Sequence, residues 1–322
     1  MVKKYSLVVS LYNEEEALPD FYREVVKVLL LIENPFEIIF VNDGSTDGTR
    51  GILYGISKEN PDVKVLHFSR NFGHEAAMLA GIDYASGEGI ICMDGDLQHP
   101  PVLLPDMVRA FEGGYDIINM VRTKNPTAGI LKNITSDIFY HFINQVSEVK
   151  LVSNASDFFG ISKRVADVMR KSYREKTRFL RGYVQNVGFN SIQIPYEAGR
   201  RVAGSSKYSI RKLLRFSINT IMTFSSLPLK LGMYAGGFAG LLSFIMIVYT
   251  IYTWAKVGTP SGYATIICLI CFMFSVLFFI VGIIGEYIGL IFSEIRDRPI
   301  YIVEESINMG ERAQENKPPC RG

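Results

Sequence analysis

The stretch Ile90-Ile91-Cys92-Met93-Asp94-Gly95-Asp96-Leu97-Gln98 decides the fold class of this chain. Its apolar run predicts a short buried strand that ends at two carboxylates, with Gly95 between them allowing the backbone to turn. Residues i and i+2 of an extended chain point to the same side, so Asp94 and Asp96 can converge at the carboxyl end of this strand. Two hard oxygen ligands suit Mg²⁺ or Mn²⁺ shared with substrate phosphates. For the motif in isolation, a solvated Asp-Gly turn is the simpler interpretation.

Apolar runs alternate with helical stretches on both sides of this motif, from residue 1 to about residue 200. We expect strands at Tyr5–Ser10, Glu37–Val41, Val63–Phe68 and Gly89–Met93, and helices at Glu16–Leu31 and Ala76–Ala85. Such alternation predicts an α/β fold with a mostly parallel, Rossmann-like sheet that is covered on both faces. Ligands of these sheets bind outside the carboxyl ends of the strands.

Acidic and polar side chains follow three of the expected strands at these ends. Tyr12-Asn13-Glu14-Glu15 follows the first strand, Asp43 the second, and Asp94 with Asp96 the fourth. The chain has neither a P-loop nor a dinucleotide fingerprint, and its four histidines show no H-E-x-x-H spacing. Without a glycine-rich phosphate cradle, a metal ion has to neutralise the phosphates, which favours a diphosphate ligand bridged to the two aspartates.

Two long uncharged runs set the C-terminal part apart. Hydrophobic residues make up 48% of the 322 residues, and the runs 231–255 and 257–285 contain no charge. Each run is long enough for one membrane span of about 20 residues, so we expect a transmembrane hairpin with spans at 232–255 and 263–285. Two buried helices of a soluble protein would give a similar pattern.

Basic residues before the first span predict the orientation. Six cations and no acid fall within residues 198–220, which places the N-terminal region in the cytoplasm by the positive-inside tendency. The N-terminus has no apolar h-region, so we expect no signal peptide and a multi-pass protein of the inner (cytoplasmic) membrane. Apolar residues at helical spacing within 208–230, with cations on the other faces, predict an amphipathic interfacial helix. The expected organisation is therefore 1–207 catalytic domain, 208–230 interfacial helix, 231–289 hairpin and 290–322 cytoplasmic tail, disordered after Val303.

Three motifs together carry a family resemblance. Residues 8–15 (VVSLYNEE), 41–49 (VNDGSTDGT) and 94–101 (DGDLQHPP) resemble the successive motifs of family 2 glycosyltransferases, in the polyprenyl-phosphate branch that includes bactoprenol glucosyltransferases and dolichyl-phosphate mannose synthase. The resemblance extends from Tyr5 to about Val303. It implies a GT-A fold and an inverting, metal-dependent transfer of a hexose to polyprenyl (undecaprenyl) phosphate at the cytoplasmic membrane face. UDP-glucose is the first choice of donor, and UDP-N-acetylglucosamine or another sugar nucleotide is the alternative.

The resemblance also implies roles for individual residues. Those expected at the donor are Tyr12, Glu14, Asp43 and Arg70, and those expected at the Mg²⁺ or Mn²⁺ ion are Asp94, Asp96 and Gln98. Those expected at the acceptor phosphate are Arg122, Lys132, Ser136, Arg201 and Lys207. Asp94, Asp96 and Asp157 are the expected catalytic residues.

Asp157 raises two separate questions. Its side chain could orient the acceptor phosphate or carry a residual proton, or it could cap a helix at Ile161–Met169. The family arginine two positions later is Phe159 here, so a phosphate contact is missing or is supplied by Arg178 or Arg181.

The acceptor chemistry simplifies the protein's task. A lipid phosphate, with a second pKa of about 6, is already largely ionised at pH 7, so no base has to remove a proton from it. Twelve Lys or Arg residues within 170–215, against Glu175 and Glu197, supply charge to hold two anions together or to attract anionic lipid. We expect a sugar nucleotide, the lipid and the membrane as partners, and no nucleic acid; a homo-oligomer is possible. A non-catalytic nucleotide-sugar binder or a flippase accessory protein is the alternative from another class.

Overall fold

A computed structural model describes residues 3–123, 155–176, 179–199, 227–257, 262–296 and 298–309. The chain divides into two compact units. Met1–Asn144, Val149–Tyr208 and Arg298–Gly322 form the first unit, and Gln145–Glu148 with Ser209–Asp297 form the second. Lys132, Ser136, Arg201 and Lys207 lie outside the described residues, as does the predicted interfacial helix except for residues 227–230.

The first unit is built on a mixed sheet of eight strands in the order β7-β5-β6-β4-β1-β2-β3-β8. The strands are β1 (Tyr5–Leu11), β2 (Phe36–Asn42), β3 (Val63–Phe68), β4 (Gly89–Asp94), β5 (Ile117–Arg122), β6 (Ala155–Ser162), β7 (Ser191–Tyr196) and β8 (Val303–Ile307). The central strands β3, β2, β1 and β4 are parallel, whereas β6 and β8 pair antiparallel with their neighbours. The predicted α/β fold of GT-A type is confirmed.

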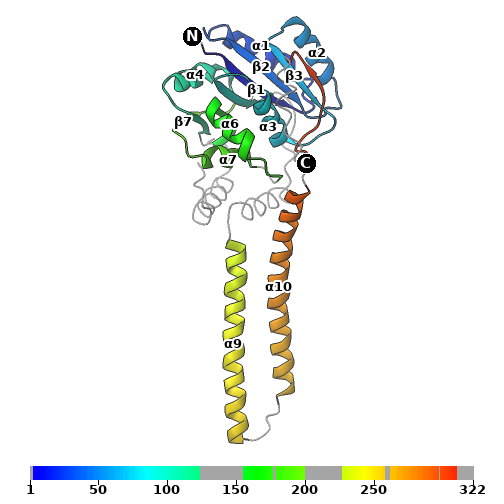
Figure 1. The fold of residues 1–322 in the computed structure, drawn as a ribbon, viewed down its shortest axis with the longest axis vertical. Coiled ribbons are helices and arrows are strands. Elements are labelled where there is room, and N and C mark those ends of the chain that lie inside the picture. The colour runs from blue at the N-terminus through cyan, green and yellow to red at the C-terminus, as the bar shows by residue number, and fades with distance from the viewer. Residues whose placement is uncertain are drawn as a thin grey trace. The chain divides into compact units, whose positions relative to one another are not determined.

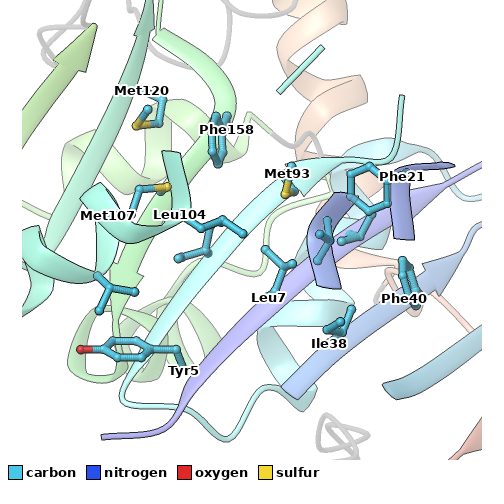
Figure 2. Packing of buried hydrophobic residues seen from close by; sticks show 14 of the residues in the cluster. Tyr5, Leu7, Phe21, Ile38, Phe40, Met93, Leu104, Met107, Met120 and Phe158 are labelled. Atoms are coloured by element: carbon cyan, nitrogen blue, oxygen red, sulfur yellow. The ribbon is translucent and has the colours of Figure 1, made fainter. Parts of the chain in front are cut away.

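Helices cover both faces of this sheet. They are α1 (Leu18–Leu29), α2 (Thr49–Glu59), α3 (His74–Tyr84), α4 (Leu104–Glu112), α6 (Lys163–Ser172) and α7 (Leu180–Asn186), with a 3₁₀ turn at Pro101–Leu103. Figure 2 shows Leu7 of β1 in a cluster that includes Phe21 of α1 and Leu104 of α4. Val8 points to the other face, where it meets Gly81 of α3. All seven residues of β1 are therefore buried, which explains why its sequence is mostly apolar.

The sequence analysis predicted β1 to β4 but not β5 to β8, and β8 lies in the tail that was expected to be disordered. Val303–Ile307 pairs antiparallel with the edge strand β3, and the red strand runs beside β3 in Figure 1. Asn308 follows it and donates to the carbonyls of Ser57 and Val63 at 2.7 and 2.9 Å. The expectation of disorder after Val303 is therefore wrong for residues 304–309, because pairing with an open sheet edge stabilises a segment too polar to be predicted as a strand.

The second unit contains two long helices that lie side by side, α9 (Leu227–Val257) and α10 (Tyr263–Ile295) (Figure 1). Ser243 of α9 contacts the Met273 sulfur of α10 at 2.8 Å. Leu231–Tyr252 and Phe272–Ile295 are long and apolar enough to cross a membrane, with mean hydropathies of 1.9 and 2.2. Most of their apolar side chains are exposed, unlike those of a soluble core helix. Helix α10 also continues past the predicted end of the second span at residue 285.

Candidate active site

The strand register brings the ends of β1, β2 and β4 to one edge of the sheet. Ser10 is paired with Asp94, and Leu11 is paired with Asn42, which precedes Asp43. Strand β6 runs antiparallel to β4 with Phe159 paired to Cys92, so Asp157 reaches the same edge as Asp94. Asp157 lies inside β6 and α6 begins only at Lys163, so the interpretation of Asp157 as a helix cap is wrong.

His74, the first residue of α3, stands between the two aspartates. Its Nδ1 atom lies 2.9 Å from Ser10 Oγ and 3.5 Å from Asp94 Oδ1, and its Nε2 atom lies 3.8 Å from Asp157 Oδ2. Burial alone would lower the pKa of His74, but the carboxylates of Asp94 and Asp157 raise it above its ordinary value. The sequence analysis gave His74 no role of its own. Its position at the first turn of the helix after the third strand was the available signal.

Arg181 from α7 supplies the cation that Phe159 does not. Its Nε atom lies 2.9 Å from Asp157 Oδ1, and its Nη1 group donates to the Ala155 carbonyl at 2.8 Å. Phe159 itself is buried in β6. Burial would raise the pKa of Asp157, but the positive charge of Arg181, aided by His74, holds it below its ordinary value. Asp157 is therefore an anion at neutral pH. Arg178 lies outside the described residues.

His99 contacts the backbone at the end of β4. Its buried ring accepts the backbone N–H of Asp94 at Nδ1, over 3.0 Å, and stacks on Phe158 with ring centres 5.1 Å apart. Burial lowers the pKa of His99, so the ring is neutral at pH 7. The Nη2 atom of Arg122 lies 3.3 Å from His99 Nε2, and Arg122 donates from Nε to the Tyr196 hydroxyl at 3.0 Å. The structure thus places Arg122, a predicted acceptor residue, beside the strand end that carries Asp94.

The turn after β4 is tightly constrained. Asp96 is buried and accepts the backbone N–H and the side-chain amide of Gln98, at 3.1 and 2.6 Å. Leu97 between them has φ 61°, a left-handed conformation that costs free energy in a non-glycine residue and recurs at functional sites. Gly95 does not have a positive φ. A Cβ there would lie 2.3 Å from a Leu11 methyl, so packing rather than the predicted backbone turn selects glycine.

The donor atoms at this edge fit the predicted metal. Asp94 and Asp96 provide carboxylate oxygens, the ligands that Mg²⁺ and Mn²⁺ prefer. The described residues contain no group of three or more His, Cys, Asp or Glu side chains that could hold a metal ion. An ion here therefore needs substrate oxygens or water to complete its shell, as Mg²⁺ does in phosphate-bound sites. The Gln98 amide nitrogen donates to Asp96, which leaves the amide oxygen for an ion.

The predicted donor residues lie on the neighbouring loops. Asp43 is buried, and its two carboxylate oxygens accept the backbone N–H groups of Phe72 and Gly73 at 2.6 and 2.9 Å. Asp43 therefore orders the loop that carries Arg70. Tyr12 is 47% exposed at the end of β1, where a flat ring is accessible to a nucleoside.

The Arg70 loop and the loop after β2 pack backbone against backbone. Gly44 has φ +65°, and a Cβ on it would lie 2.4 Å from the Arg70 carbonyl carbon. Glu14 is tied to the same region by its backbone N–H, which donates to Thr49 Oγ1 at 3.0 Å. The loops after the first three parallel strands thus form one interlocked surface at the carboxyl edge of the sheet.

Comparison with known families accounts for both units of the chain. The glycosyl transferase family 2 model matches residues 6–169, and the GtrB C-terminal hairpin model matches residues 227–291. The second match covers most of α9 and α10.

Curated relatives match over nearly the whole length. The "Uncharacterized glycosyltransferase YkcC" of Bacillus subtilis is 38% identical over 307 residues, which cover 94% of each chain. The "SfII prophage-derived bactoprenol glucosyl transferase" of Shigella flexneri is 37% identical over 304 residues, which cover 94% of this chain and 98% of the relative. Among solved structures, glucosyl-3-phosphoglycerate synthase from Mycobacterium tuberculosis has a TM-score of 0.48 at 17% identity, covering 68% of this chain and 76% of the other.

Proposed function

Because this chain belongs to glycosyltransferase family 2, we propose that it transfers a hexose, in first place glucose from UDP-glucose, to polyprenyl (undecaprenyl) phosphate. The reaction is inverting and depends on Mg²⁺ or Mn²⁺. One observation carries the proposal: Asp94 ends β4 and Asp96 follows it in the next turn, at the edge of the sheet where Arg181 holds Asp157 as an anion. Relatives named bactoprenol glucosyl transferase support the lipid acceptor, and the matched hairpin supports membrane association. The six cations within residues 198–220 favour the cytoplasmic face for the N-terminal region.

The residues suggest a single displacement. An ion held by Asp94 and Asp96 would neutralise the leaving nucleoside diphosphate. A phosphate oxygen of the acceptor forms the bond to the anomeric carbon, the bond to the diphosphate breaks, and the configuration inverts. This oxygen is already ionised at neutral pH, so Asp157 need not act as a base. The low pKa of Asp157 agrees with a positioning role, in which it orients Arg181 and His74. Arg122 and Arg181 would then hold the acceptor anion.

UDP-N-acetylglucosamine as donor and a non-catalytic nucleotide-sugar binder remain as alternatives, and one experiment separates them. The purified full chain is incubated with polyprenyl phosphate and labelled UDP-glucose or UDP-N-acetylglucosamine, with Mg²⁺, with Mn²⁺, or with a chelator. We expect labelled lipid from UDP-glucose that disappears with the chelator. Labelled lipid from UDP-N-acetylglucosamine instead would identify that sugar nucleotide as the donor. Binding of a donor without formation of labelled lipid would reject the proposal that the chain is an enzyme.

Paired variants test the metal site in the same assay. Asp96→Ala should abolish transfer without unfolding the chain, because it removes one of the two carboxylates expected to bind the metal ion. Asp106→Asn is the control, because Asp106 lies on α4 and, among the residues that the structure describes, its ion pair is with Arg109. Near-normal turnover by Asp96→Ala in Mg²⁺ would reject the metal role.

A further inference from the structure

A cavity of about 320 Å³ opens between three separate segments of the first unit. The described residues that line it are Arg70, Asn71, Phe72, Gly73, Lys176, Arg298, Pro299 and Ile300. Three of these eight are cationic and none is acidic. A hollow with one sign of charge in its walls concentrates ions of the opposite sign, so this lining suits an anion.

Two arginines of the cavity, Arg70 and Arg298, have hydrogen-bond donors available for an anion. In the part of the chain that the structure describes, neither Arg70 nor Arg298 forms an ion pair with a carboxylate, whereas Arg50, Arg164, Arg174 and Arg181 each do. The Arg70 guanidinium carbon lies over the Phe72 ring, 3.9 Å from its centre, and the guanidinium donates to the Asn71 carbonyl at 3.0 Å. Arg298 is exposed. Both guanidinium groups therefore retain donors for an incoming anion.

The walls of the cavity are fixed before any ligand arrives. Asp43 holds the loop on one side through two backbone N–H groups. On the other side, the Tyr301 hydroxyl donates to Asp83 at 2.6 Å, and the Tyr301 ring stacks on Phe68 with centres 5.2 Å apart. The Ser69 N–H donates to the Ile302 carbonyl at 3.1 Å, which joins the two sides directly. A preformed site loses less entropy on binding than one that has to be ordered.

The sequence position of Arg298 favours one source of the anion. Arg298 is the third residue after Ile295, which ends the apolar helix α10. Three extended residues reach about 11 Å at most, and the headgroup layer beyond the hydrocarbon core is about 5–8 Å thick. If α10 ends at the membrane surface, Arg298 lies in or near the layer that holds lipid phosphates. A guanidinium fork matches a phosphate through two parallel hydrogen bonds.

We propose that this cavity binds the phosphate group of an anionic membrane lipid that is neither the sugar donor nor the acceptor. The inference rests on the membrane insertion contained in the proposed function. A bound headgroup would hold the Arg70 loop against the segment that follows α10. The diphosphate of the sugar nucleotide is the other source of the same chemistry, and the experiment distinguishes the two.

Lipid retention provides the direct test. The purified full chain is reconstituted in nanodiscs of phosphatidylcholine in which about one quarter is replaced by phosphatidylglycerol, and the lipids that stay bound after extraction are measured by native mass spectrometry. We expect selective retention of phosphatidylglycerol by the wild type. Arg298→Gln should weaken it about fivefold, the effect of one cation near a surface, and Arg298→Lys should retain part of it.

Arg296→Gln is the matched control. Arg296 is also exposed, but it follows α10 directly, stacks on Phe292 with its guanidinium carbon 5.2 Å from the ring centre, and does not line the cavity. Its variant should retain the lipid like the wild type. Equal losses in the Arg296 and Arg298 variants, or no loss in either, would overturn the site.

Two further measurements distinguish a lipid site from a site for the donor diphosphate. In detergent without phosphatidylglycerol, Arg298→Gln should leave the Michaelis constant for the sugar nucleotide unchanged. A rise of fivefold or more would assign the cavity to the donor diphosphate and overturn the proposal that it binds a lipid. Inorganic phosphate should not displace retained phosphatidylglycerol, because it lacks the membrane anchor. Wild-type transfer in the same detergent tests the proposed function independently, whether or not the lipid is retained.

Discussion

The Nε atom of Arg181 lies 2.9 Å from Oδ1 of Asp157, and this pair joins α7 to the antiparallel strand β6 at the edge of the sheet where Asp94 ends β4. The pair places a cation beside Asp157, although Phe159 stands where the family resemblance predicts an arginine. His74 contacts the other oxygen of Asp157, at 3.8 Å, so both oxygens have a cationic neighbour when His74 is protonated.

Arg181→Gln should lower the rate of transfer strongly. The substitution removes the charge that holds Asp157 and, in the proposed mechanism, the acceptor phosphate. Loss of one preorganised donor to a developing charge costs about 10²–10³-fold in kcat in other enzymes. We expect a loss of that order in kcat/KM for polyprenyl phosphate, measured by the formation of labelled lipid.

Arg109→Gln is the control for this variant. Arg109 lies on the exposed side of α4, where it pairs with Asp106, and its loss should leave the rate unchanged. A normal rate in Arg181→Gln would show that another group supplies the charge at Asp157. Recovery in Arg181→Lys would show that charge matters more than the planar geometry of arginine.

Gly44→Ala should impair the donor side of the site. Alanine is strained at φ +65°, and its methyl group would lie 2.4 Å from the backbone of Arg70, so the Arg70 loop has to move. We expect the Michaelis constant for the sugar nucleotide to rise about tenfold or more, as a displacement of this size does for positioning groups. Kinetics at saturating acceptor measure the effect.

Gly51→Ala is the matched control on the neighbouring helix α2. Nothing lies within 4 Å of a Cβ at Gly51, and its backbone is helical. This substitution should raise the free energy of unfolding by about 0.5–1 kcal/mol and leave the Michaelis constant for the sugar nucleotide unchanged. An unchanged Michaelis constant in Gly44→Ala would mean that the Arg70 loop does not contact the donor.

Local patterns in the sequence were sufficient for the parallel strands β1 to β4 and for one pair of site residues. Asp94 and Asp96 follow an apolar run, so their convergence at a strand end depends only on the alternation of an extended chain. Arg181 and His74 could not be found this way, because they reach Asp157 from two separate helices and only the tertiary packing brings them together. The family pattern named Arg181 only as one of two replacements for a missing cation.

The prediction from the sequence is wrong for β8, because a long-range contact stabilises this strand. Val303–Ile307 carries two glutamates and a serine, which a disordered tail would also carry. The strand exists because β3 would otherwise be an open edge and because Arg50 pairs with Glu304 and Glu305, at 3.0 and 2.9 Å. The register of such a pair cannot be read from either segment alone.

Glu37→Gln should reveal a pH-dependent part of the stability. Burial would raise the pKa of Glu37, but hydrogen bonds from Lys64, Ser6 and Ser86 lower it to about 2, from an ordinary 4.5. A group whose pKa is lower in the folded state stabilises the fold above its unfolded value, and that stability is lost as pH falls from about 4.5 towards 2. The contribution near neutral pH is on the order of 3 kcal/mol.

The wild type should therefore unfold at a higher temperature than Glu37→Gln at pH 7, and this difference should shrink as the pH falls below about 4.5. Glu33→Gln is the control, because Glu33 is exposed on the loop before β2 and its loss should change little at any pH. A difference between wild type and Glu37→Gln that stays constant from pH 7 to pH 3 would contradict the low pKa.

Tyr301→Phe tests whether the segment after α10 is an integral part of the first unit. The Tyr301 hydroxyl donates to Oδ2 of Asp83 at 2.6 Å, and Arg174 reaches the same buried carboxylate at 2.8 Å. Burial raises the pKa of Asp83 while Arg174 opposes the rise, so losing a donor leaves a costly buried charge. We expect a loss of about 1–3 kcal/mol in the free energy of unfolding, measured by denaturant unfolding of the purified chain.

The phenylalanine keeps the stacking on Phe68, so this loss would report the hydrogen bond rather than the ring. Tyr54→Phe provides the comparison, because the Tyr54 hydroxyl donates to Glu305 at an exposed position, where solvent replaces it and the cost should be below about 1 kcal/mol. If the two variants lose the same stability, Tyr301 is only a surface contact. A larger loss in Tyr301→Phe would mean that the chain which leaves α10 is anchored in the sheet through Asp83, and that shortening it before Tyr301 would destabilise the domain that carries Asp94.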